Sequence, residues 1–551
     1  MNGKEYMSRL FRDHGHTHVF YMETLFTATF LDLEEMYGVK PVLAHSELAA
    51  GYMADGYARS TQKPGLCFAQ SIGAANLAAG IHDAWLANSP VVAVTGKKMP
   101  HLQYRNAYQE SDHSKLFQGV TKFHGIAFEA GEFARVLKQG LREATTGRPQ
   151  PVHIDAFDFE GIATEDAEMN GPYDPELQYS KSPAYRPSAD ESSVKKAAEA
   201  INKASKPILV IGRGAAVSDK EKTLAALARK ADIPIVCTPD GKTFVDEDDS
   251  LWLGVAGTYG MFSANRAIKE ADLVIYAGSM VSDQTTLGFS APSSKTLIIQ
   301  IDIDGAKIGQ NYPNTIGLNG DVLMVAGQLA KEVKEKRRDQ WREATAAYKR
   351  EFFKELTDLA DKASNGVNIA KMCGEISKVL PDDAIVVADT GWSAMWSSTA
   401  LRMKSTQNYY RAAGTLGWSF PASLGVKCAH KERPVINFTG DGGMMYYFTE
   451  WETAVREGLN IISIVNHNGL LAQCVRFREE ATQKMMDQER EKISFPNINF
   501  SEAAKAFGAN GVRIEKIADL APAIKVAIES EKPTLIEVMT DWEISPLAPI
   551  K

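Results

Sequence analysis

The chain has 551 residues, of which 44% are hydrophobic and 24% are charged, and its formal net charge is -8. At about 100–200 residues per domain, this length predicts about three domains. The acidic balance argues against nucleic acid or an anionic membrane as a partner, because neither attracts an acidic protein. No apolar run approaches the roughly 18 residues that a membrane-spanning helix needs. The five scattered cysteines form no C-x-x-C pair, so we expect reduced thiols, no structural zinc and a cytoplasmic protein.

The first segment, residues 1–165, alternates short apolar runs with helical patterns. Its runs at 91–96 and 151–155 have the composition of buried strands, and such alternation is typical of a parallel sheet with helices on its faces. Residues 166–191 are polar and proline-rich and lack periodicity, so we expect a linker there. The chain is therefore predicted to begin with an α/β domain that is followed by a linker.

The rest of the chain repeats this style of alternation twice. Residues 192–330 form a second α/β segment, with clear apolar runs at 208–212 and 297–301. A charged helical stretch, residues 331–363, is expected to connect it to a third segment, residues 364–551, which again alternates strand and helix. The first and third segments look like units of similar size on either side of a different middle one. The predicted fold class is therefore α/β, with three consecutive parallel-sheet domains.

Three sequence patterns carry chemistry, and the first lies in the N-terminal segment. Residues 45–59 read HSELAAGYMADGYAR. Glu47 stands at the start of an otherwise apolar helix face, where a carboxylate is costly unless it has a task. The second pattern lies in the C-terminal segment, where residues 414–425 read GTLGWSFPASLG and place the large apolar Leu416 between two glycines.

The third pattern joins an acidic turn to a distant asparagine. An apolar run at 434–438 leads to a glycine-rich turn that contains Asp441, and a second run at 461–465 leads to Asn468. Both side chains are oxygen donors at predicted strand ends, which is what a hard cation such as Mg²⁺ requires when it carries a diphosphate. Glycines let backbone N–H groups approach phosphate oxygens, and the start of the following helix favours an anion. The glycines of this turn are Gly440, Gly442 and Gly443.

Together these patterns resemble the thiamin-diphosphate enzymes that are built like the acetolactate synthase large subunit, and the resemblance covers nearly the whole chain. It implies thiamin diphosphate and Mg²⁺ as cofactors. Asn468 follows Asp441 at the family interval, so the resemblance implies these side chains and the carbonyl of Leu470 as metal ligands. It also implies that Glu47 activates the cofactor by promoting the tautomer that removes its C2 proton. Leu416 takes the place of the apolar residue that props the cofactor into a bent shape.

Smaller matches to this family imply further contacts. One is the turn at 71–76, and another is the loop after the apolar run at 384–388, where the family touches the diphosphate. A third is the stretch YQESD at 108–112, in which Gln109 is a candidate catalytic residue that orients the substrate or an intermediate. The cofactor contacts implied in this way are Asn76, Gly391, Trp392, Ser393 and Gly414.

The chain departs from the family around the predicted substrate. Leu25 and Phe26 stand where several members have a residue that handles protons, so we expect a bulkier and more apolar pocket. Glu47, Gln109, His113 or the amine of the cofactor would then do the proton work. The predicted substrate pocket consists of Leu25, Phe26, Tyr108, Gln109, His113 and Phe477.

The middle segment resembles the nucleotide-binding domain of the same family. Gly212-Arg213-Gly214 occupies the nucleotide turn, and residues 300–304 read QIDID. In flavin-binding relatives two arginines follow, but this chain has Met280 and Gln284 there. FAD is therefore disfavoured, and ADP or another nucleotide stays open.

The resemblance implies an enzyme, a lyase or transferase that acts next to a carbonyl group. It would decarboxylate a 2-oxo acid, or join carbonyl compounds such as a hydroxy-ketone or an aldehyde. The site would lie at the interface of a homodimer or homotetramer, with Glu47 from one subunit and Asp441 and Asn468 from the other. Alternatives are a 2-hydroxyacyl-CoA lyase or oxalyl-CoA-type decarboxylase, and a flavin-dependent enzyme like pyruvate oxidase. A dinucleotide-dependent dehydrogenase would need a fuller glycine turn, and a non-catalytic scaffold would be expected to lose Glu47.

Overall fold

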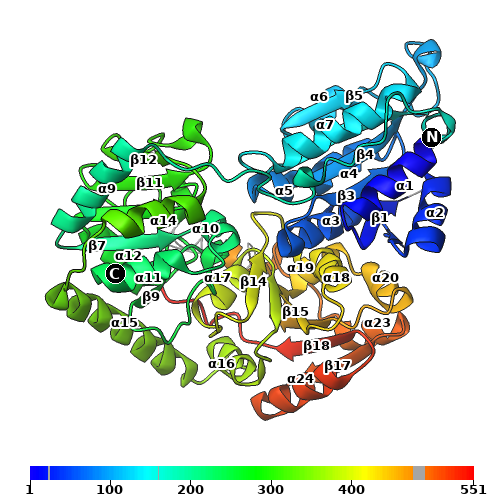
Figure 1. The fold of residues 1–551 in the computed structure, drawn as a ribbon. Coiled ribbons are helices and arrows are strands. Elements are labelled where there is room, and N and C mark those ends of the chain that lie inside the picture. Colours follow the sequence, from blue (N-terminus) through cyan, green and yellow to red (C-terminus); the bar gives the residue numbers. More distant parts are fainter. Residues whose placement is uncertain (23–24, 159, 476–489, 551) are drawn as a thin grey trace.

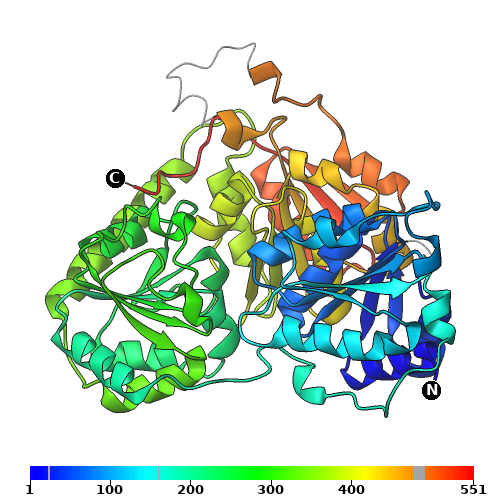
Figure 2. The ribbon, with the colours of Figure 1, turned by 90° about the horizontal axis from the view of Figure 1, so that it is seen from above.

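The computed structural model describes residues 1–22, 25–158, 160–475 and 490–550. These residues form three α/β domains in chain order, each built on a six-stranded parallel sheet with helices on both faces (Figures 1 and 2). The predicted fold class of three consecutive parallel-sheet domains is confirmed. Among the described helices, none combines the length and apolar character needed to cross a membrane.

The N-terminal domain has the strand order β2-β1-β3-β4-β6-β5. Its strands are β1 (His18–Met22), β2 (Lys40–Leu43), β3 (Gly65–Ala69), β4 (Val91–Lys97), β5 (Phe123–Ile126) and β6 (Val152–Phe157). Its helices are α1 (Gly3–Asp13), α2 (Thr27–Tyr37), α3 (Glu47–Thr61), α4 (Ala74–Gly80), α5 (His82–Leu86), α6 (His113–Phe117), α7 (Phe133–Thr145) and α8 (Ile162–Asp166). The central strands are buried on both sides, as the near-continuous apolar runs predict.

The central domain has the strand order β12-β11-β10-β7-β8-β9, which is the arrangement of dinucleotide-binding sheets. Its strands are β7 (Pro207–Ile211), β8 (Ile235–Cys237), β9 (Trp252–Val255), β10 (Leu273–Ala277), β11 (Leu297–Asp302) and β12 (Thr315–Asn319). Its helices are α9 (Glu191–Lys203), α10 (Arg213–Ser218), α11 (Thr223–Ala231), α12 (Phe262–Glu270), α13 (Asp283–Thr286) and α14 (Val322–Glu332). The long α15 (Asp339–Ala360) packs Trp341 and Phe352 against this domain and leads to the next one.

The C-terminal domain has the strand order β14-β13-β15-β16-β18-β17, which repeats the N-terminal pattern strand for strand. Its strands are β13 (Ile385–Ala388), β14 (Asn408–Arg411), β15 (Val435–Gly440), β16 (Ile462–His467), β17 (Asn510–Ile514) and β18 (Thr534–Met539). Its described helices are α16 (Ile369–Val379), α17 (Trp392–Thr399), α18 (Ser419–Ala429), α19 (Asp441–Tyr446), α20 (Glu450–Arg456), α23 (Phe500–Ala506) and α24 (Leu520–Glu529). The two outer domains therefore share one topology, and the middle domain has another.

The two outer domains are joined through a close contact of helices α3 and α18 (Figure 1). A Cβ atom on Gly56 would overlap the backbone of Ala422, and one on Gly425 would overlap the backbone of Met53. Only glycine lets two helix backbones approach this closely. One hydrophobic cluster runs through the contact and contains residues from both domains, such as Tyr52 and Trp418. The N- and C-terminal domains thus share a core.

Candidate active site

Three neighbouring strands of the C-terminal sheet end at the same edge and carry the predicted metal site. The order β13-β15-β16 brings together the loop after Ala388, the turn at Asp441 and the end of β16 at His467. Asp441 Oδ2 accepts the backbone N–H groups of Asn468 at 3.0 Å and of Gly469 at 2.6 Å. The two residues that the sequence singled out, 27 positions apart, therefore lie side by side.

Asp441 is a buried carboxylate that pairs with no cationic side chain among the described residues. Its exposed fraction is 3%, and within the described part of the chain it accepts only backbone N–H groups and forms no ion pair. Burial raises the pKa of Asp441 above its ordinary value. Asn468 Oδ1 lies 3.2 Å from the backbone nitrogen of Leu470, so a second oxygen donor is fixed nearby. The carboxylate oxygens of Asp441 and the amide oxygen of Asn468 are ligands that a hard divalent cation prefers. Such a cation would also compensate the buried charge of Asp441.

The glycines at this edge of the sheet occupy their positions for different physical reasons. Gly391 has a φ of +69°, a left-handed conformation that favours glycine. A Cβ atom on Gly443 would lie 2.7 Å from Thr439 Oγ1, and one on Gly442 would lie 2.8 Å from a methyl group of Leu471. Gly440, in contrast, leaves ordinary room. The turn is therefore packed tightly beneath Gly442 and Gly443, with Gly440 as the N-cap of α19.

Asp389 holds this edge together, although the sequence patterns did not assign it a role. Its buried carboxylate accepts the backbone N–H groups of Thr390, Gly417 and Ser419 at 2.9–3.1 Å and the Ser419 hydroxyl at 2.7 Å. It thereby ties the loop after β13 to the loop that carries Leu416. The signal in the sequence was a carboxylate at the end of a buried apolar run. Trp392 and Ser393, which follow, are buried, and the Trp392 ring belongs to the domain core.

A second buried carboxylate, Asp83 of the N-terminal domain, holds the other end of the Leu416 loop. Asp83 accepts the backbone N–H groups of Ala413, Gly414 and Thr415 at 2.9–3.1 Å. Leu416 itself is half-buried and belongs to no hydrophobic cluster of the described residues. Its side chain is therefore available to support a bound group, on a loop that carboxylates from both domains fix in place.

Asp83 belongs to a buried charge network between the two domains. Arg59 Nη2 lies 2.7 Å from Asp83 Oδ1, and Arg59 also pairs with Asp55. Trp418 Nε1 donates to Asp55 Oδ2 at 2.9 Å, and Arg59 Nη1 donates to the carbonyl of Arg411 at 2.8 Å. Burial acts to raise the pKa of Asp83, but Arg59 and the backbone N–H groups outweigh it and lower that pKa. The network is thus satisfied and ionised.

Glu47 lies at the first position of α3, after the β2 strand. Ser46 caps the helix, because its hydroxyl accepts the N–H of Ala49 at 3.1 Å. Glu47 is half-buried, and its Oε2 accepts the amide of Asn76 at 3.0 Å. A Cβ atom on Gly73 would lie 2.5 Å from Glu47 Oε1, so a larger residue there would displace this carboxylate. Glu47 and Asn76, predicted separately, are therefore neighbours.

Gln109 lies against the same turn. Its carboxamide is 3.5 Å from the Ile72 nitrogen and 3.4 Å from Gln70 Oε1, and its carbonyl accepts the Ser71 hydroxyl at 2.6 Å. Gln109 has a φ of 61°, an uncommon conformation for a residue with a side chain. Such strain is held by surrounding contacts and clusters at functional sites. Tyr108, beside it, is 75% exposed.

Other residues of the predicted substrate pocket lie elsewhere. Leu25 and Phe26 are fully buried in the core of the N-terminal domain, where Phe26 packs against Phe68 and Phe133. Neither presents a surface to a ligand, because the chain turns at Phe26 and buries both side chains behind the sheet. His113 is also fully buried, beneath Ser71. Phe477 lies outside the described residues.

The N- and C-terminal halves of the site are not joined by a direct contact among the described residues. The contacts of Glu47 lie in its own domain, and those of Asp441 lie in the C-terminal domain. The contact nearest to Glu47 that crosses between them is made by His45, whose ring nitrogen is 2.8 Å from Glu452 Oε2. One chain therefore presents two half-sites.

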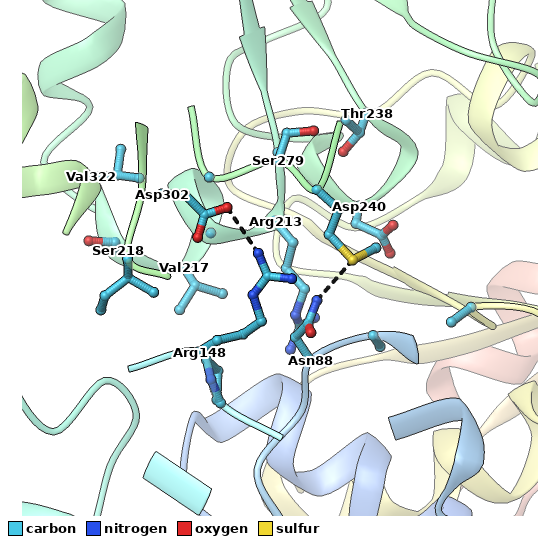
Figure 3. A pocket seen from close by; sticks show the side chains of 18 of the residues that line it. Asn88, Arg148, Arg213, Val217, Ser218, Thr238, Asp240, Ser279, Asp302 and Val322 are labelled. Carbon is cyan, nitrogen blue, oxygen red and sulfur yellow. Dashed lines mark hydrogen bonds and ion pairs between the residues drawn. The ribbon is translucent and has the colours of Figure 1, made fainter. Parts of the chain in front are cut away.

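A separate cavity of about 380 Å³ lies at the carboxyl edge of the central sheet, between this domain and the other two (Figure 3). Gly212 and Gly214 pack against the backbone of Gly278, where a Cβ atom on Gly212 would overlap Gly278. Met280 and Gln284 line the cavity at the positions of the missing arginines. Its volume lies within the usual range of small-molecule sites.

Arg213 is the notable charge in this cavity. It stands at the first position of α10 and extends toward Asn88 (Figure 3). Among the described residues it forms no hydrogen bond or ion pair, whereas the neighbouring Arg148 pairs with Asp302 at 3.0 Å. Burial lowers the pKa of Arg213, and Arg59 adds to this effect. A guanidinium without an anion, at a glycine turn of a dinucleotide-type sheet, fits a phosphate group.

The sequence matches three family models along its length. Residues 1–116 match the "Thiamine pyrophosphate enzyme, N-terminal TPP binding domain" and residues 194–329 match the central domain of the same enzymes. Residues 389–538 match the "Thiamine pyrophosphate enzyme, C-terminal TPP binding domain". Each match falls within one of the three domains, in chain order, and the N-terminal match ends before β5 and β6.

Curated relatives align over nearly the full chain. The probable acetolactate synthase large subunit of Methanocaldococcus jannaschii is 30% identical over 525 residues, which are 92% of this chain and 87% of the relative. The acetolactate synthase isozyme 1 large subunit of Escherichia coli is 29% identical over 517 residues, 93% of this chain and 89% of the relative. The predicted resemblance is thereby confirmed.

Proposed function

Because the chain belongs to the thiamine pyrophosphate enzyme family, we propose that it makes or breaks a carbon–carbon bond next to a carbonyl group. Its substrate would be a small 2-oxo acid, hydroxy-ketone or aldehyde, and the reaction a decarboxylation, an acyloin-type ligation or both. The observation that carries this proposal is the pair of half-sites. Glu47 rests on Gly73 and Asn76 in one, and Asp441 meets Asn468 in the other.

The C-terminal half-site fits a metal-bound diphosphate. Asp441, Asn468 and the carbonyl of Leu470 would hold Mg²⁺, with backbone N–H groups near Gly391 and Gly442 for the phosphates. The buried carboxylate of Asp441, which has no cation among the described residues, supports this assignment. When bound, thiamin diphosphate supplies a carbon nucleophile that adds to a carbonyl group and accepts the electrons released when the neighbouring bond breaks.

Each residue of the proposed site has a distinct task. Glu47 holds and exchanges a proton at its carboxylate, and Asn76 fixes the orientation of that carboxylate. Gln109 orients the substrate from the adjoining turn. Leu416 gives apolar support, because Asp83 and Asp389 hold its loop from two sides. Uncharged support of this kind does not compete for hydrogen bonds.

We further propose that a second copy of the chain completes the site. Glu47 and Asp441 have no common contact among the described residues of one chain, although each has the features of a half-site. Large side chains near both halves are exposed, including Tyr104 at 97% and Tyr446 at 62%. Apolar surface next to polar half-sites is typical of a subunit interface.

For the central cavity we propose a nucleotide without a flavin ring, such as ADP. Arg213 would meet a phosphate, and the close packing of Gly212 against Gly278 would let the backbone approach it. Met280 and Gln284 replace the arginines that the resemblance associates with flavin. Denatured protein should release a nucleotide that mass spectrometry identifies. A yellow protein with bound FAD would contradict this assignment.

One experiment tests the main proposal. The purified protein, stripped with a chelator and then supplied with thiamin diphosphate and Mg²⁺, is offered a panel of 2-oxo acids, 2-hydroxyacyl-CoA esters and aldehydes. We expect release of CO₂ or a new carbon–carbon product with at least one compound, and none without the cofactors. Turnover only of the CoA esters would favour the acyl-CoA lyase alternative. Silence across the panel would sink the proposal.

A further inference from the structure

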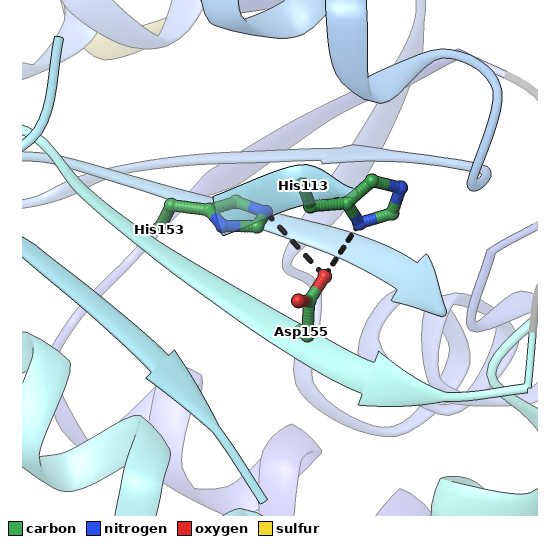
Figure 4. A group of neighbouring side chains, drawn as sticks. All are labelled: His113, His153 and Asp155. Atoms are coloured by element: carbon green, nitrogen blue, oxygen red, sulfur yellow. Dashed lines mark hydrogen bonds and ion pairs between the residues drawn. The ribbon is translucent and has the colours of Figure 1, made fainter. Parts of the chain in front are cut away.

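A buried cluster of histidines lies directly behind the Glu47 half-site. Thr95 of β4 and His153 and Asp155 of β6 meet His113 of α6. Figure 4 shows the two histidines around Asp155. All four are buried, with exposed fractions of at most 2%. None of them contacts Glu47 among the described residues, so the proposed reaction leaves this cluster without a task.

The hydrogen bonds of His113 require two ring protons. Its Nε2 lies 3.0 Å from the carbonyl oxygen of Ser71, which can only accept. Its Nδ1 lies 2.6 Å from Asp155 Oδ1. The Ser71 hydroxyl, 3.3 Å from Nε2, already donates to the carbonyl of Gln109. Since both ring nitrogens face acceptors, an ionised Asp155 leaves His113 as an imidazolium.

The other contacts of Asp155 agree with its ionisation. Lys97 Nζ lies 3.4 Å from Asp155 Oδ2, and the Thr95 hydroxyl lies 3.1 Å from Asp155 Oδ1. Burial acts to raise the pKa of Asp155, but the His113 hydrogen bond and the nearby charges of His113 and Lys97 lower it below its ordinary value. A carboxylate that receives several charge-assisted hydrogen bonds is stabilised in its charged form.

The chain of hydrogen bonds continues to the surface. The Thr95 hydroxyl donates to the carboxylate and accepts from His153 Nε2 at 2.8 Å. His153 Nδ1 is 2.7 Å from His124 Nδ1, so His124 is the donor of that bond. His124 is half-buried, and burial lowers the pKa of both His153 and His124. These two rings are therefore neutral, and the hydrogen bonds from His124 to His153, from His153 to Thr95 and from Thr95 to Asp155 run in one direction.

A metal ion does not fit this cluster. His113 Nδ1 and Asp155 Oδ1 are 2.6 Å apart, whereas two ligands of one tetrahedral ion with bonds of about 2.1 Å lie about 3.4 Å apart. The Thr95 hydroxyl also fills the space between the rings, since it is within 3.1 Å of His113 Nδ1 and of His153 Nε2. The geometry is that of a hydrogen-bond network.

We propose that His113 is a positioning residue, a buried imidazolium paired with Asp155 that holds Ser71, and through Ser71 the strained backbone of Gln109, beside Glu47. The contacts run from His113 to the Ser71 carbonyl and hydroxyl and from that hydroxyl to Gln109. The charged or titratable groups around the cluster are Asp155, which pairs with His113, then His153, Lys97 and His124, which lie near Asp155, and Asp112, whose charge acts on His124. This inference rests on the proposed function only for the role of Gln109.

The protonation of His113 can be measured without any activity. A neutron structure of the full-length protein at pH 7 should show hydrogen on both ring nitrogens of His113 and none on Asp155. A single ring hydrogen on His113 would overturn the proposal. This measurement stands even if no substrate is found, so it separates failure of this inference from failure of the proposed function.

A double-mutant cycle tests the path to Gln109. His113→Gln should lower kcat/KM by about tenfold, with unchanged affinity for thiamin diphosphate, because Gln109 is displaced while Glu47 is not. In a Gln109→Ala background, His113→Gln should cost nothing further. Additive losses would show that His113 acts elsewhere. His82→Gln, an exposed histidine on α5, is the matched control and should leave kcat/KM unchanged. Asp155→Asn is the second variant if His113→Gln does not fold.

Discussion

The N- and C-terminal domains share one strand order but hold their buried aspartates in opposite ways. In the N-terminal domain, Asp83 is paired with Arg59 and Asp155 with His113, and the pKa of both carboxyls is lowered. In the C-terminal domain, Asp389 and Asp441 accept only N–H and hydroxyl groups, and burial raises the pKa of both. One half of the site is therefore neutralised from within, and the other retains a negative charge for a cation. The same scaffold supports both because helices α3 and α6 supply Arg59 and His113 in the N-terminal domain, whereas the partners in the C-terminal domain are mainly backbone N–H groups of loops and helix starts.

The largest expected effect removes the proton-carrying group of the N-terminal half. Glu47→Gln should lower kcat by about 10²–10⁴-fold, the usual contribution of a general acid or base, while thiamin diphosphate still binds. Steady-state kinetics and calorimetric titration of the cofactor measure the two quantities. Glu502→Gln, an exposed glutamate in the first turn of α23, is the matched control. Full activity in Glu47→Gln would remove the distinction between the two halves.

The next largest effect is expected from breaking the buried ion pair of Arg59 with Asp83 in the N-terminal domain. Asp83→Asn should lower the free energy of unfolding by about 3–5 kcal/mol, because Arg59 would be left buried with half of its compensation. Denaturant titration measures this change. The exposed pair of Arg350 with Glu343 offers the control, in which Glu343→Gln should change stability by about 0–1 kcal/mol. Equal losses in the two variants would contradict the role of burial.

In the C-terminal half-site, removing a buried carboxylate should not lower the stability of the metal-free protein. Asp441→Asn should weaken thiamin diphosphate binding in Mg²⁺ by at least about 10–100-fold, which is the usual cost of losing even an outer-shell partner of a metal ligand. Without metal, the same variant should melt at an equal or higher temperature, because burial disfavours the charge that it removes. Asp519→Asn, an exposed aspartate in the same domain, should change neither quantity. A lower melting temperature for metal-free Asp441→Asn would show that its charge stabilises the fold.

The smallest effect is the pH dependence of the two halves. A carboxyl whose pKa is lowered by folding stabilises the fold at pH values above its unfolded pKa, which is near 4. This stabilisation is lost as the pH falls below that value, so the regions of Asp83 and Asp155 should open only below about pH 4. A raised pKa destabilises the charged form, so the regions of Asp389 and Asp441 should become more stable as pH falls from 7 toward 4 in the metal-free protein. Hydrogen exchange, corrected for its intrinsic pH dependence, resolves the two. Parallel slopes would contradict the comparison.

The sequence predicted those site residues whose location in the fold follows directly from the element that they follow in the chain. Asp441 and Asn468 follow buried strands, and the carboxyl ends of adjacent parallel strands meet at one edge, so their contact could be expected. Glu47 and Asn76 were each predicted from a separate family motif, and the structure brings them into contact. The three-domain α/β fold followed from apolar runs that alternate with helical patterns.

The residues that sequence reasoning misplaced or missed depend on contacts made across the fold. Leu25 and Phe26 follow β1, but the left-handed turn at Phe26 sends both side chains into the core, which no local pattern shows. Asp83 meets Gly414 and Thr415 of another domain. Asp389 was visible only as the end of a strand. The domain boundaries at 165, 191, 330 and 363 stay predictions.

The close crossing of α3 and α18 has a consequence for the synthesis of the chain. Gly56 emerges from the ribosome several hundred residues before Gly425, the glycine that allows the partner helix to pack closely. At about 5–20 residues per second, the apolar face of α3 stays exposed for tens of seconds before α18 has been synthesised. During that interval the N-terminal domain exposes half of a core that it cannot close alone. Newly made chains should therefore depend on chaperones until the C-terminal domain is complete.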